Sequence, residues 1–515
     1  MVLLMHNTDA RLVKQDNVLF AHTVPPVDAS DIASINIEYA TLTTDIDHPS
    51  PGPIVPQSFT TTSPKKVFRA EEIAFRLTPT QPPGIEVKES DPAGFTDTAH
   101  PAEIARNASK WGIKSLKEKA RLTYQAIATQ NKNGTYPYDR YLKNGSNFVT
   151  IVETPVTNIS KECIVWCTNL YLGLNRNPHI IEVVKSQLDL YGTGCGTSAV
   201  SGGFSNKHKE LESEIAIWTG KEDAILYPTG FTTNLGAIST IATPNDLIIF
   251  DKECHASIID GIKLSGAQFK TFRNNNPKHL ETILEKINPD QFDNIFVLTE
   301  AVFGMTGEEA PIAKYCELKN KFPFLLYVDE AHSVGIYGKT GAGYCQHTGC
   351  SDQVDFIMGT LSKATASIGG FIACRKEFAA FLRISSNPYM FQACLPPADI
   401  IAAIEAIKII KTTPLLQTKL WGNTRRFRDG LIQLGFNVGN GTSPIVPIFI
   451  ERDDVLANVC KFLYSRGVYT NWIAYPAVKK NNGRLRFIVS AGHTVEQIEE
   501  TLSILKEADK QFMIV

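Results

Sequence analysis

Short apolar runs alternate with longer amphipathic patterns from about Asn169 onward, and this alternation restricts the fold more than any other feature of the chain. The runs are too short for buried helices and end in polar or turn residues. They are AILYP (224–228), DLIIFD (246–251), NIFVLTE (294–300), FLLYVDE (324–330) and DFIMGT (355–360). Strands that alternate with helices predict an α/β fold with a mostly parallel sheet covered on both faces.

Changes in composition divide the chain into four predicted parts. Residues 1–108 are rich in proline, which resists regular structure. We expect disorder there, while docking of a partner stays open. Residues 109–168 form a helix, expected over 109–132, and an arm. Residues 169–410 form the large domain, and residues 411–515 form a smaller α/β domain.

The overall composition excludes several classes of protein. The net charge of -2 and the 20% of charged residues indicate neither nucleic acid nor an anionic membrane as partner. We expect no membrane span and a cytoplasmic location, because no apolar stretch reaches about 20 residues and the opening MVLLM is too short for a signal peptide. Ten scattered cysteines favour reduced thiols. Cys345, His347 and Cys350 fit no common zinc spacing, so we interpret them as a loop and expect no metal.

A lysine follows the last of these apolar runs. The segment GTLSKATASIGG (359–370) places Lys363 on a turn between two strands, where its amine faces a cleft. Lysine forms a Schiff base when its surroundings lower its pKa. A lysine among small residues is by itself more typical of a solvated loop, so this interpretation depends on its neighbours.

Acidic and imidazole side chains stand at the ends of other runs. Asp329 ends FLLYV, where a buried carboxylate needs a cation such as a protonated pyridine nitrogen, although a helix cap is the simpler alternative. His332 follows three residues later. His255 comes after LIIFD, where its ring could lie on an aromatic cofactor or could simply be a hydrogen-bonded surface residue.

A phosphate site is predicted at the turn in YPTGFTTN (227–234). The amides of Gly230 and Phe231 begin a helix there, and a helix N-terminus attracts anions. Thr360, three residues before Lys363, offers a hydroxyl to the same anion.

The chain resembles the α-oxoamine synthases, which are fold-type I pyridoxal-phosphate (PLP) enzymes, from about residue 169 to 505. Six motifs occur in the order of that family. They are NLYLGL (169–174), YPTGFTTNLG (227–236), HASIIDG (255–261), VDEAHSVG (328–335), GTLSKATASIGG (359–370) and RLRFIVSAGHT (484–494). The resemblance implies a seven-stranded, mostly parallel sheet, a small C-terminal domain, pyridoxal 5'-phosphate as cofactor, and a homodimer.

The resemblance also implies roles for individual residues. Lys363 would carry the cofactor as a Schiff base, Asp329 would face the pyridine nitrogen, and His255 would stack on the ring. His332 would reach the phenolic oxygen, and Glu300 falls where the family has an acidic residue near the cofactor. The implied catalytic residues are therefore Lys363, His255, Asp329 and His332.

Asn169 and Arg486 resemble the pair that holds the amino-acid carboxylate. An arginine suits this task because its planar fork matches two carboxylate oxygens, although a surface salt bridge is the alternative reading. The implied reaction joins an L-amino acid to an acyl thioester, with loss of CO₂, to give an α-aminoketone. Coenzyme A and an acyl carrier protein both stay open as the thiol.

Three positions depart from the family pattern. Gly304 stands where relatives often have serine, so one hydroxyl near the cofactor is missing. Gln392 replaces a small Ser or Thr near the phosphate across the dimer interface. Ala199, in GTGCGTSAVSGG (192–203), offers no grip on a succinyl carboxylate, which disfavours succinyl-CoA.

Several functions remain in competition. TGFTTNLGAISTIA is most similar to serine palmitoyltransferases, while 8-amino-7-oxononanoate synthase and a carrier-protein-fed synthase are alternatives. A silent partner subunit is disfavoured because Lys363, Asp329 and His255 are all present. A PLP-sensing transcription regulator would need a basic helix-turn-helix, which the first hundred residues lack.

Overall fold

The computed structural model describes residues 101–515, apart from 135, 137, 139, 155–158 and 476, and four short strands before them. The chain separates into two compact units, 1–91 and 92–515. In the first unit two antiparallel strand pairs are described, namely β1 (Leu3–Leu4) with β4 (Ile37–Glu38) and β2 (Val13–Gln15) with β3 (Val18–Phe20). The disorder expected for residues 1–108 otherwise falls almost entirely outside the described residues.

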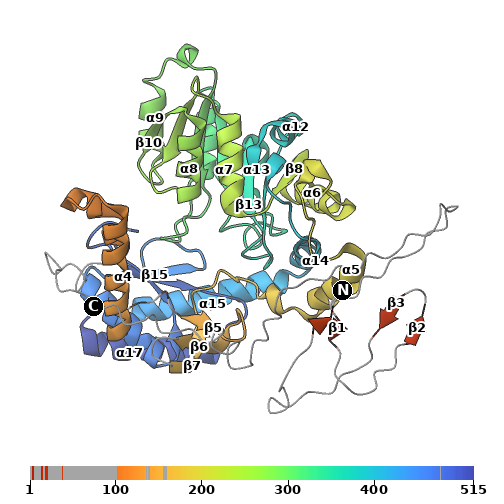
Figure 1. Ribbon diagram of the computed structural model, residues 1–515. Helices are drawn as coiled ribbons and strands as arrows, with labels where there is room; N and C mark the ends of the chain where they lie inside the picture. The colour runs from red at the N-terminus through yellow and green to blue at the C-terminus, as the bar shows by residue number, and fades with distance from the viewer. Residues whose placement is uncertain are drawn as a thin grey trace. The chain divides into compact units, whose positions relative to one another are not determined.

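A seven-stranded sheet forms the centre of the second unit (Figure 1), in the order β10-β9-β11-β12-β13-β14-β8. The strands are β8 (Asp223–Tyr227), β9 (Leu247–Asp251), β10 (Gln268–Phe272), β11 (Ile295–Glu300), β12 (Leu325–Asp329), β13 (Phe356–Thr360) and β14 (Gly370–Cys374). Only β14 runs antiparallel to its neighbours. The mostly parallel sheet is therefore confirmed. The edge strand β10 was not predicted, because its first four residues are exposed and do not form an apolar run.

Both faces of this sheet are buried, because successive strand residues point to opposite sides. Ile248 and Phe250 of β9 enter one apolar core, while Leu247 and Ile249 enter the other. This two-sided burial explains why the strands read as continuous apolar runs.

Helices supply the other side of each core. Residues of α5 (Pro178–Tyr191), α6 (Asn206–Thr219), α9 (Pro277–Leu284), α10 (Ile312–Lys319), α11 (Tyr344–His347) and α14 (Pro397–Thr412) belong to the first core. Residues of α7 (Gly230–Ile241), α8 (Ala256–Ser265), α12 (Lys376–Ser385) and α13 (Asn387–Phe391) belong to the second. The short 3₁₀ helices η2 (Leu174–Arg176), η3 (Ala199–Ser201), η4 (Pro289–Gln291) and η5 (Ser351–Gln353) lie in the connections.

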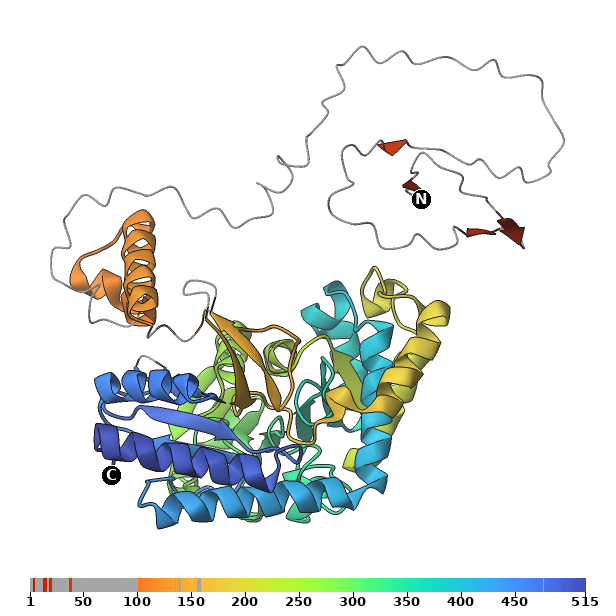
Figure 2. The same cartoon turned by 90° about the horizontal axis from the view of Figure 1, so that it is seen from below.

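The C-terminal region has its own core. It contains a three-stranded antiparallel sheet, β15-β18-β17, with α15 and α17 packed against each other (Figure 2). The elements are α15 (Pro414–Gln433), β15 (Ile445–Phe449), α16 (Asp453–Ser465), β16 (Val468–Tyr469), β17 (Asn471–Ile473), β18 (Arg484–Ile488) and α17 (Val495–Phe512). These strands and helices give the region the α/β character expected for residues 411–515.

The arm before residue 169 joins this C-terminal region. Strands β5 (Tyr141–Leu142), β6 (Val149–Thr154) and β7 (Ile159–Val165) form a sheet whose other edge is β16. Ile164 and Trp166 lie in the C-terminal core, and Trp166 stacks on Phe427 with ring centroids 4.5 Å apart. Our sequence-based boundaries did not anticipate this pairing, which joins segments about 300 residues apart.

Two predictions about the N-terminal helices were wrong in detail. The helix expected over 109–132 is α4 (Leu116–Asn133), preceded by the 3₁₀ helix η1 (Ala108–Trp111). Gly112 separates the two with φ of 83°, a left-handed conformation that a continuous helix does not allow. The last residues of the predicted irregular leader form α3 (Pro101–Asn107), which starts with proline at a position that tolerates it. Among the described residues, no helix is long and apolar enough to cross a bilayer.

Candidate active site

Most of the predicted site residues stand at or just beyond the carboxyl ends of the parallel strands. Glu300 ends β11, Asp329 ends β12 and Thr360 ends β13, and these three strands are neighbours in the sheet. Gly230 follows β8, and His255 follows β9. Ligands gather at this edge of an open α/β sheet, so the fold itself brings these side chains together.

Lys363 lies on the turn between β13 and β14, among buried charges. Burial lowers the pKa of its amine from 10.5 to about 8, while the negative charges of Asp329 and Glu300 oppose this shift and Arg486 adds to it. An amine with this pKa is partly neutral near pH 8 and can act as a nucleophile or a base.

Glu300 and Asp329 face each other across adjacent strands, in register. Burial raises the pKa of Glu300, and the neighbouring Asp329 raises it further, whereas Lys363 and the amides of Gly304 and His255 lower it. Two buried carboxyl groups this close do not both ionise readily. Glu300 therefore retains a proton more easily than an exposed glutamate does.

Asn234, on α7, fixes the carboxylate of Asp329. Its side-chain Nδ2 donates to Asp329 Oδ2 at 2.7 Å and to Ser257 Oγ at 2.9 Å, and its Oδ1 accepts from the Tyr327 hydroxyl at 2.7 Å. The amide of Ala331 donates to the other oxygen, Asp329 Oδ1, at 2.9 Å. The amide group of Asn234 is thus fully used, and its orientation follows from partners of fixed polarity.

The same hydrogen-bonded chain orients His255. Ser257 bonds to His255 Nδ1 through its hydroxyl at 2.7 Å and through its amide at 3.2 Å. An amide N–H can only donate, so Nδ1 accepts, and Nε2 carries the proton of the neutral ring. Burial lowers the pKa of His255, which favours that neutral form.

His332 is held by Tyr171 and lies over Gly304. The Tyr171 hydroxyl and His332 Nδ1 are 2.8 Å apart. Burial lowers the pKa of His332 well below its usual range, so the ring is neutral. A Cβ atom on residue 304 would lie 2.6 Å from His332 Nε2. The glycine at 304, which sequence comparison suggested as a missing hydroxyl, is therefore what makes room for this imidazole.

The N-terminus of α7 forms a cradle suited to phosphate. Thr229 caps the helix, and the first amides, at Gly230 and Phe231, lie where an α-helix leaves its N–H groups without internal acceptors. A Cβ atom on residue 230 would lie 2.8 Å from Thr360 Oγ1. The hydroxyl therefore faces the helix end, and only glycine leaves this cradle open.

Asn169 and Arg486 are hydrogen-bonded to each other. One Arg486 guanidinium nitrogen donates to Asn169 Oδ1 at 3.2 Å, and Nε donates to the carbonyl of Gly304 at 2.7 Å. Burial lowers the pKa of this guanidinium. Within the described part of the chain no carboxylate forms a salt bridge with Arg486, so a buried cation has only neutral acceptors.

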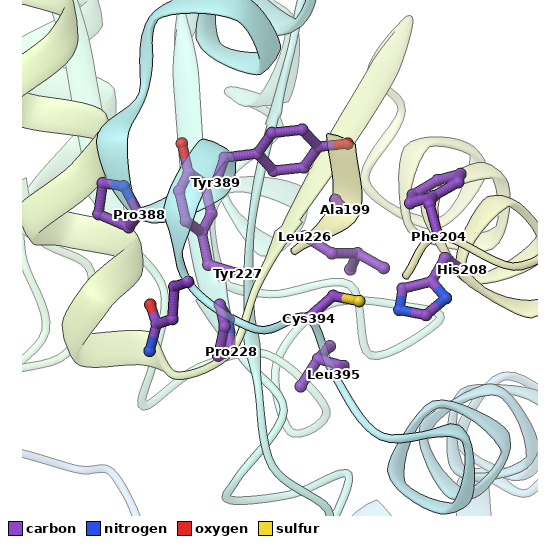
Figure 3. Close-up of a pocket in the computed structure, with 11 residues that line it drawn as sticks. Ala199, Phe204, His208, Leu226, Tyr227, Pro228, Pro388, Tyr389, Cys394 and Leu395 are labelled. Carbon is purple, nitrogen blue, oxygen red and sulfur yellow. The ribbon is translucent and has the colours of Figure 1, made fainter. Parts of the chain in front are cut away.

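The other two departures from the family pattern share one small pocket. Ala199 and Gln392 both line it, together with Tyr389 and His208 (Figure 3). Ala199 begins η3, and Gln392 follows α13. Neither side chain brings a charge to this pocket.

Sequence reasoning missed Asn234, Ser257 and Tyr171, although each lies inside a motif that had been quoted. Their neighbours in the motifs have groups with recognised chemistry, whereas an amide or hydroxyl acquires a role only through its partners. For Asn234, the signal was a polar residue within the buried face of an apolar helix.

The aminotransferase class I and II family model matches residues 161–505. A serine palmitoyltransferase from Bacteroides thetaiotaomicron is 37% identical over 381 residues, which covers 73% of this chain and 94% of that protein. An 8-amino-7-oxononanoate synthase from Thermoanaerobacter pseudethanolicus is 34% identical over 371 residues, or 71% and 94% of the two chains.

Solved structures agree with these relatives. A serine palmitoyltransferase variant from S. paucimobilis, with a bound PLP–myriocin aldimine, matches with a TM-score of 0.74 and 28% identity, covering 78% of this chain and all of the other. The glycine cradle at the start of α7 and the buried acid at the end of β12 fit the phosphate and the ring nitrogen of such a cofactor. The chain therefore belongs to the aminotransferase class I and II family and, within it, to the PLP-dependent α-oxoamine synthases.

Proposed function

We propose that this enzyme condenses an L-amino acid with an acyl thioester, releasing CO₂ and the thiol and leaving an α-aminoketone. In this reaction the amino acid loses its α proton, the new C–C bond forms as the thioester C–S bond breaks, and the thiolate takes up a proton. The carboxylate then leaves as CO₂, and a proton returns to the α carbon in its place. The observation that carries the proposal is the joint placement of Lys363, Asp329 and the Arg486 cation, which forms no salt bridge with a carboxylate among the described residues.

Each residue has a task that follows from its surroundings. PLP, when bound, withdraws electrons from the amino acid's α carbon. Asp329, held by Asn234, keeps the ring nitrogen protonated, and the neutral Lys363 amine takes the α proton. His255 has its proton on Nε2, and this N–H donates to the thioester carbonyl oxygen.

The remaining groups position the reactants. Arg486 and Asn169 hold the amino-acid carboxylate, which gives the guanidinium a negatively charged hydrogen-bond partner. The amides of Gly230 and Phe231 and the Thr360 hydroxyl hold the phosphate, and His332 donates to the phenolic oxygen. Glu300 stands beside this group as a buried acid.

The first substrates to test are L-serine and palmitoyl-CoA, in line with the serine palmitoyltransferase relatives. The 8-amino-7-oxononanoate synthase relative, which also aligns over 94% of its length, favours a second candidate with a different amino acid and a shorter acyl group. As a third candidate, an acyl carrier protein instead of coenzyme A carries the acyl group as its thioester.

The decisive experiment counts products. The holoenzyme is incubated with carboxyl-labelled amino acids and acyl thioesters, and released CO₂ and free thiol are measured together. We expect equal amounts of both, with the Lys363→Ala variant inactive and the exposed Lys339→Ala control active. Thiol release without CO₂, or turnover by Lys363→Ala, would contradict the proposal.

We also propose a homodimer and a cytoplasmic location. Phe391 of α13 and Val200 of η3 are 79% and 50% exposed in the single chain, and a second copy would cover such apolar side chains. All ten cysteines are free, as in proteins of reducing compartments. The molar mass in solution tests the dimer, which Phe391→Asp should weaken.

The predicted divisions of the chain remain proposals of the same kind. They place the leader at 1–108, the helix and arm at 109–168, the cofactor-binding part at 169–410 and the small domain at 411–515. Limited proteolysis tests them, because linkers between compact parts are cut first.

A further inference from the structure

We propose that Cys195, His208 and Cys394 bind a thiophilic metal ion such as Zn²⁺. Their ligand atoms lie within 4.8 Å of one another, the one such group of three among the described residues. Two thiols and an imidazole are a donor set that suits zinc or copper(I) rather than magnesium or calcium.

Three distant segments bring these side chains together. Cys195 lies in the glycine-rich segment 192–203, His208 in α6, and Cys394 after α13. Ser198 and Ala393 form an antiparallel bridge, and the amide of Cys394 donates to the carbonyl of Thr197 at 3.1 Å. The cluster therefore rests on paired backbone.

The two thiols are engaged in weak hydrogen bonds to backbone carbonyls. The thiol of Cys195 donates to the Leu395 carbonyl at 3.1 Å, and that of Cys394 donates to the Thr197 carbonyl at 3.4 Å. Figure 3 shows the sulfur of Cys394 directed at the imidazole of His208. Thiols are weak donors, so these bonds cost little to replace.

The spacing is close to what a tetrahedral site needs. Bonds of about 2.0–2.3 Å to nitrogen and sulfur place ligand atoms roughly 3.3–3.8 Å apart. The three atoms must therefore approach one another by about an ångström. Gly194 and Gly196 flank Cys195 with open space beside them, and Gly196 has φ of 71°, so this segment can make that adjustment.

The helix cap decides which ring nitrogen serves as ligand. His208 Nδ1 accepts a hydrogen bond from the amide of Ser205 at 3.1 Å. Nε2 is buried, and a hydrogen-bonding interaction of the ring with the Leu395 carbonyl raises the pKa of His208 against the effect of burial. Metal binding through Nε2 moves the ring proton to Nδ1, where Ser205 Oγ, 3.0 Å away, can accept it.

The bound ion stabilises the protein by more than the change of tautomer destabilises it. The Ser205 amide loses its acceptor, which is the loss of one neutral hydrogen bond. Structural zinc bound by cysteine and histidine contributes much more to folding than one such bond. With three protein ligands, the fourth position stays open to water. The ion would tie the glycine-rich segment to α6 and to the chain after α13.

Cobalt and zinc titrations of the reduced, chelator-treated holoenzyme test the site. We expect one ion per chain and long-wavelength cobalt absorption, away from the cofactor bands. Zinc should also raise the melting temperature in proportion to the logarithm of its concentration. The variants Cys195→Ala and Cys394→Ala should lose both signals.

The variant His208→Gln separates ligation from helix capping. Glutamine at this third position of a helix completes the same cap, so α6 should stay folded, but it lacks the imidazole. We expect the zinc affinity of this variant to be lower than that of the native enzyme by roughly tenfold or more. The matched control is Cys350→Ala, which removes a thiol near Cys316 and should leave zinc affinity unchanged.

Two results would overturn the proposal. One is zinc affinity of the native enzyme equal to that of the variant lacking both Cys195 and Cys394. The other is a Cys195–Cys394 disulfide, detected by mass spectrometry after mild oxidation, in a protein whose reduced form binds no zinc at this position. The second result would identify the cluster as a thiol pair instead.

Discussion

The two halves of the active site are built by opposite strategies. On the ring side, Asp329, Asn234 and His255 are joined by side-chain hydrogen bonds of 2.7–2.9 Å, all arising near the ends of strands in one sheet. On the substrate side, Arg486 lies on β18 and Asn169 just after the arm, and the guanidinium donates only to neutral oxygens.

This difference indicates which half has its hydrogen-bond and charge partners in place before substrate binds. The ring side has its charges compensated and its tautomer fixed, so it can tune the cofactor in every state of the enzyme. The substrate side keeps a buried cation without a counter-ion, and binding of a carboxylate completes it. Substitutions in the two halves should therefore affect different kinetic constants.

Arg486→Lys should produce the largest effect and confine it to the substrate side. Lysine keeps the charge but loses the planar fork, so we expect kcat/KM for the amino acid to fall roughly a hundredfold, or about 3 kcal/mol, mostly through KM. Steady-state kinetics measures this. Arg484→Lys, two residues earlier on β18, is the matched control because Arg484 donates to Asn482 and Met305 carbonyls. Equal losses in both variants would remove the distinction between the halves.

Asn234→Leu tests the ring side. The change leaves Asp329 Oδ2, the Tyr327 hydroxyl and Ser257 short of a partner, and we expect kcat to fall roughly thirtyfold, about 2 kcal/mol, with little change in KM. The pH profile of kcat should also shift, since Asp329 and His255 lose their common support. A change in KM alone would mean that Asn234 only maintains the fold.

The pH dependence of cofactor loading probes the amine that both halves share. Burial lowers the pKa of Lys363 to about 8, so its neutral fraction should rise about tenfold between pH 7 and pH 9. The rate at which the apoenzyme becomes covalently loaded should follow, with a midpoint near pH 8. Arg486→Gln removes a positive charge that lowers this pKa, so the midpoint should move upward. A midpoint above pH 10 would contradict the burial of the amine.

The positions of the ring-side residues could be predicted from the sequence more fully than the pairing of Asn169 with Arg486 or the role of Asn234. Lys363, Asp329 and His255 each stand at or after the end of an apolar strand, and strand ends meet at one edge, so the local pattern indicated where they lie. Their roles came only from the resemblance to a family. Asn169 and Arg486 were paired only through resemblance to a family, because nothing local relates residues 317 positions apart. Asn234 was missed because an amide on a helix acquires meaning only from Tyr327 and Asp329.

The same limit applied to the fold. The buried strands could be predicted because both of their faces need apolar residues. The edge strand β10 is mostly exposed, so the sequence did not predict it. The arm strands β5–β7 join the C-terminal region through β16, a long-range pairing that periodicity does not encode. The cysteine cluster shows this clearly. Cys345, His347 and Cys350 are close in sequence, yet Cys195, His208 and Cys394 are the group that the fold brings together.

Gly304→Ser tests where the two halves touch, and its effect should be the smallest. A relative with serine here would gain a hydroxyl, but in this chain the new Cβ would lie 2.6 Å from His332 Nε2, so the imidazole must move. Because Tyr171 holds that ring from the other side, we expect kcat to fall severalfold, about 1 kcal/mol. Adding Tyr171→Phe releases the ring, so the double variant should recover part of the loss, a coupling that a double-mutant cycle measures. Higher activity in Gly304→Ser alone would mean that the hydroxyl outweighs the displacement of His332.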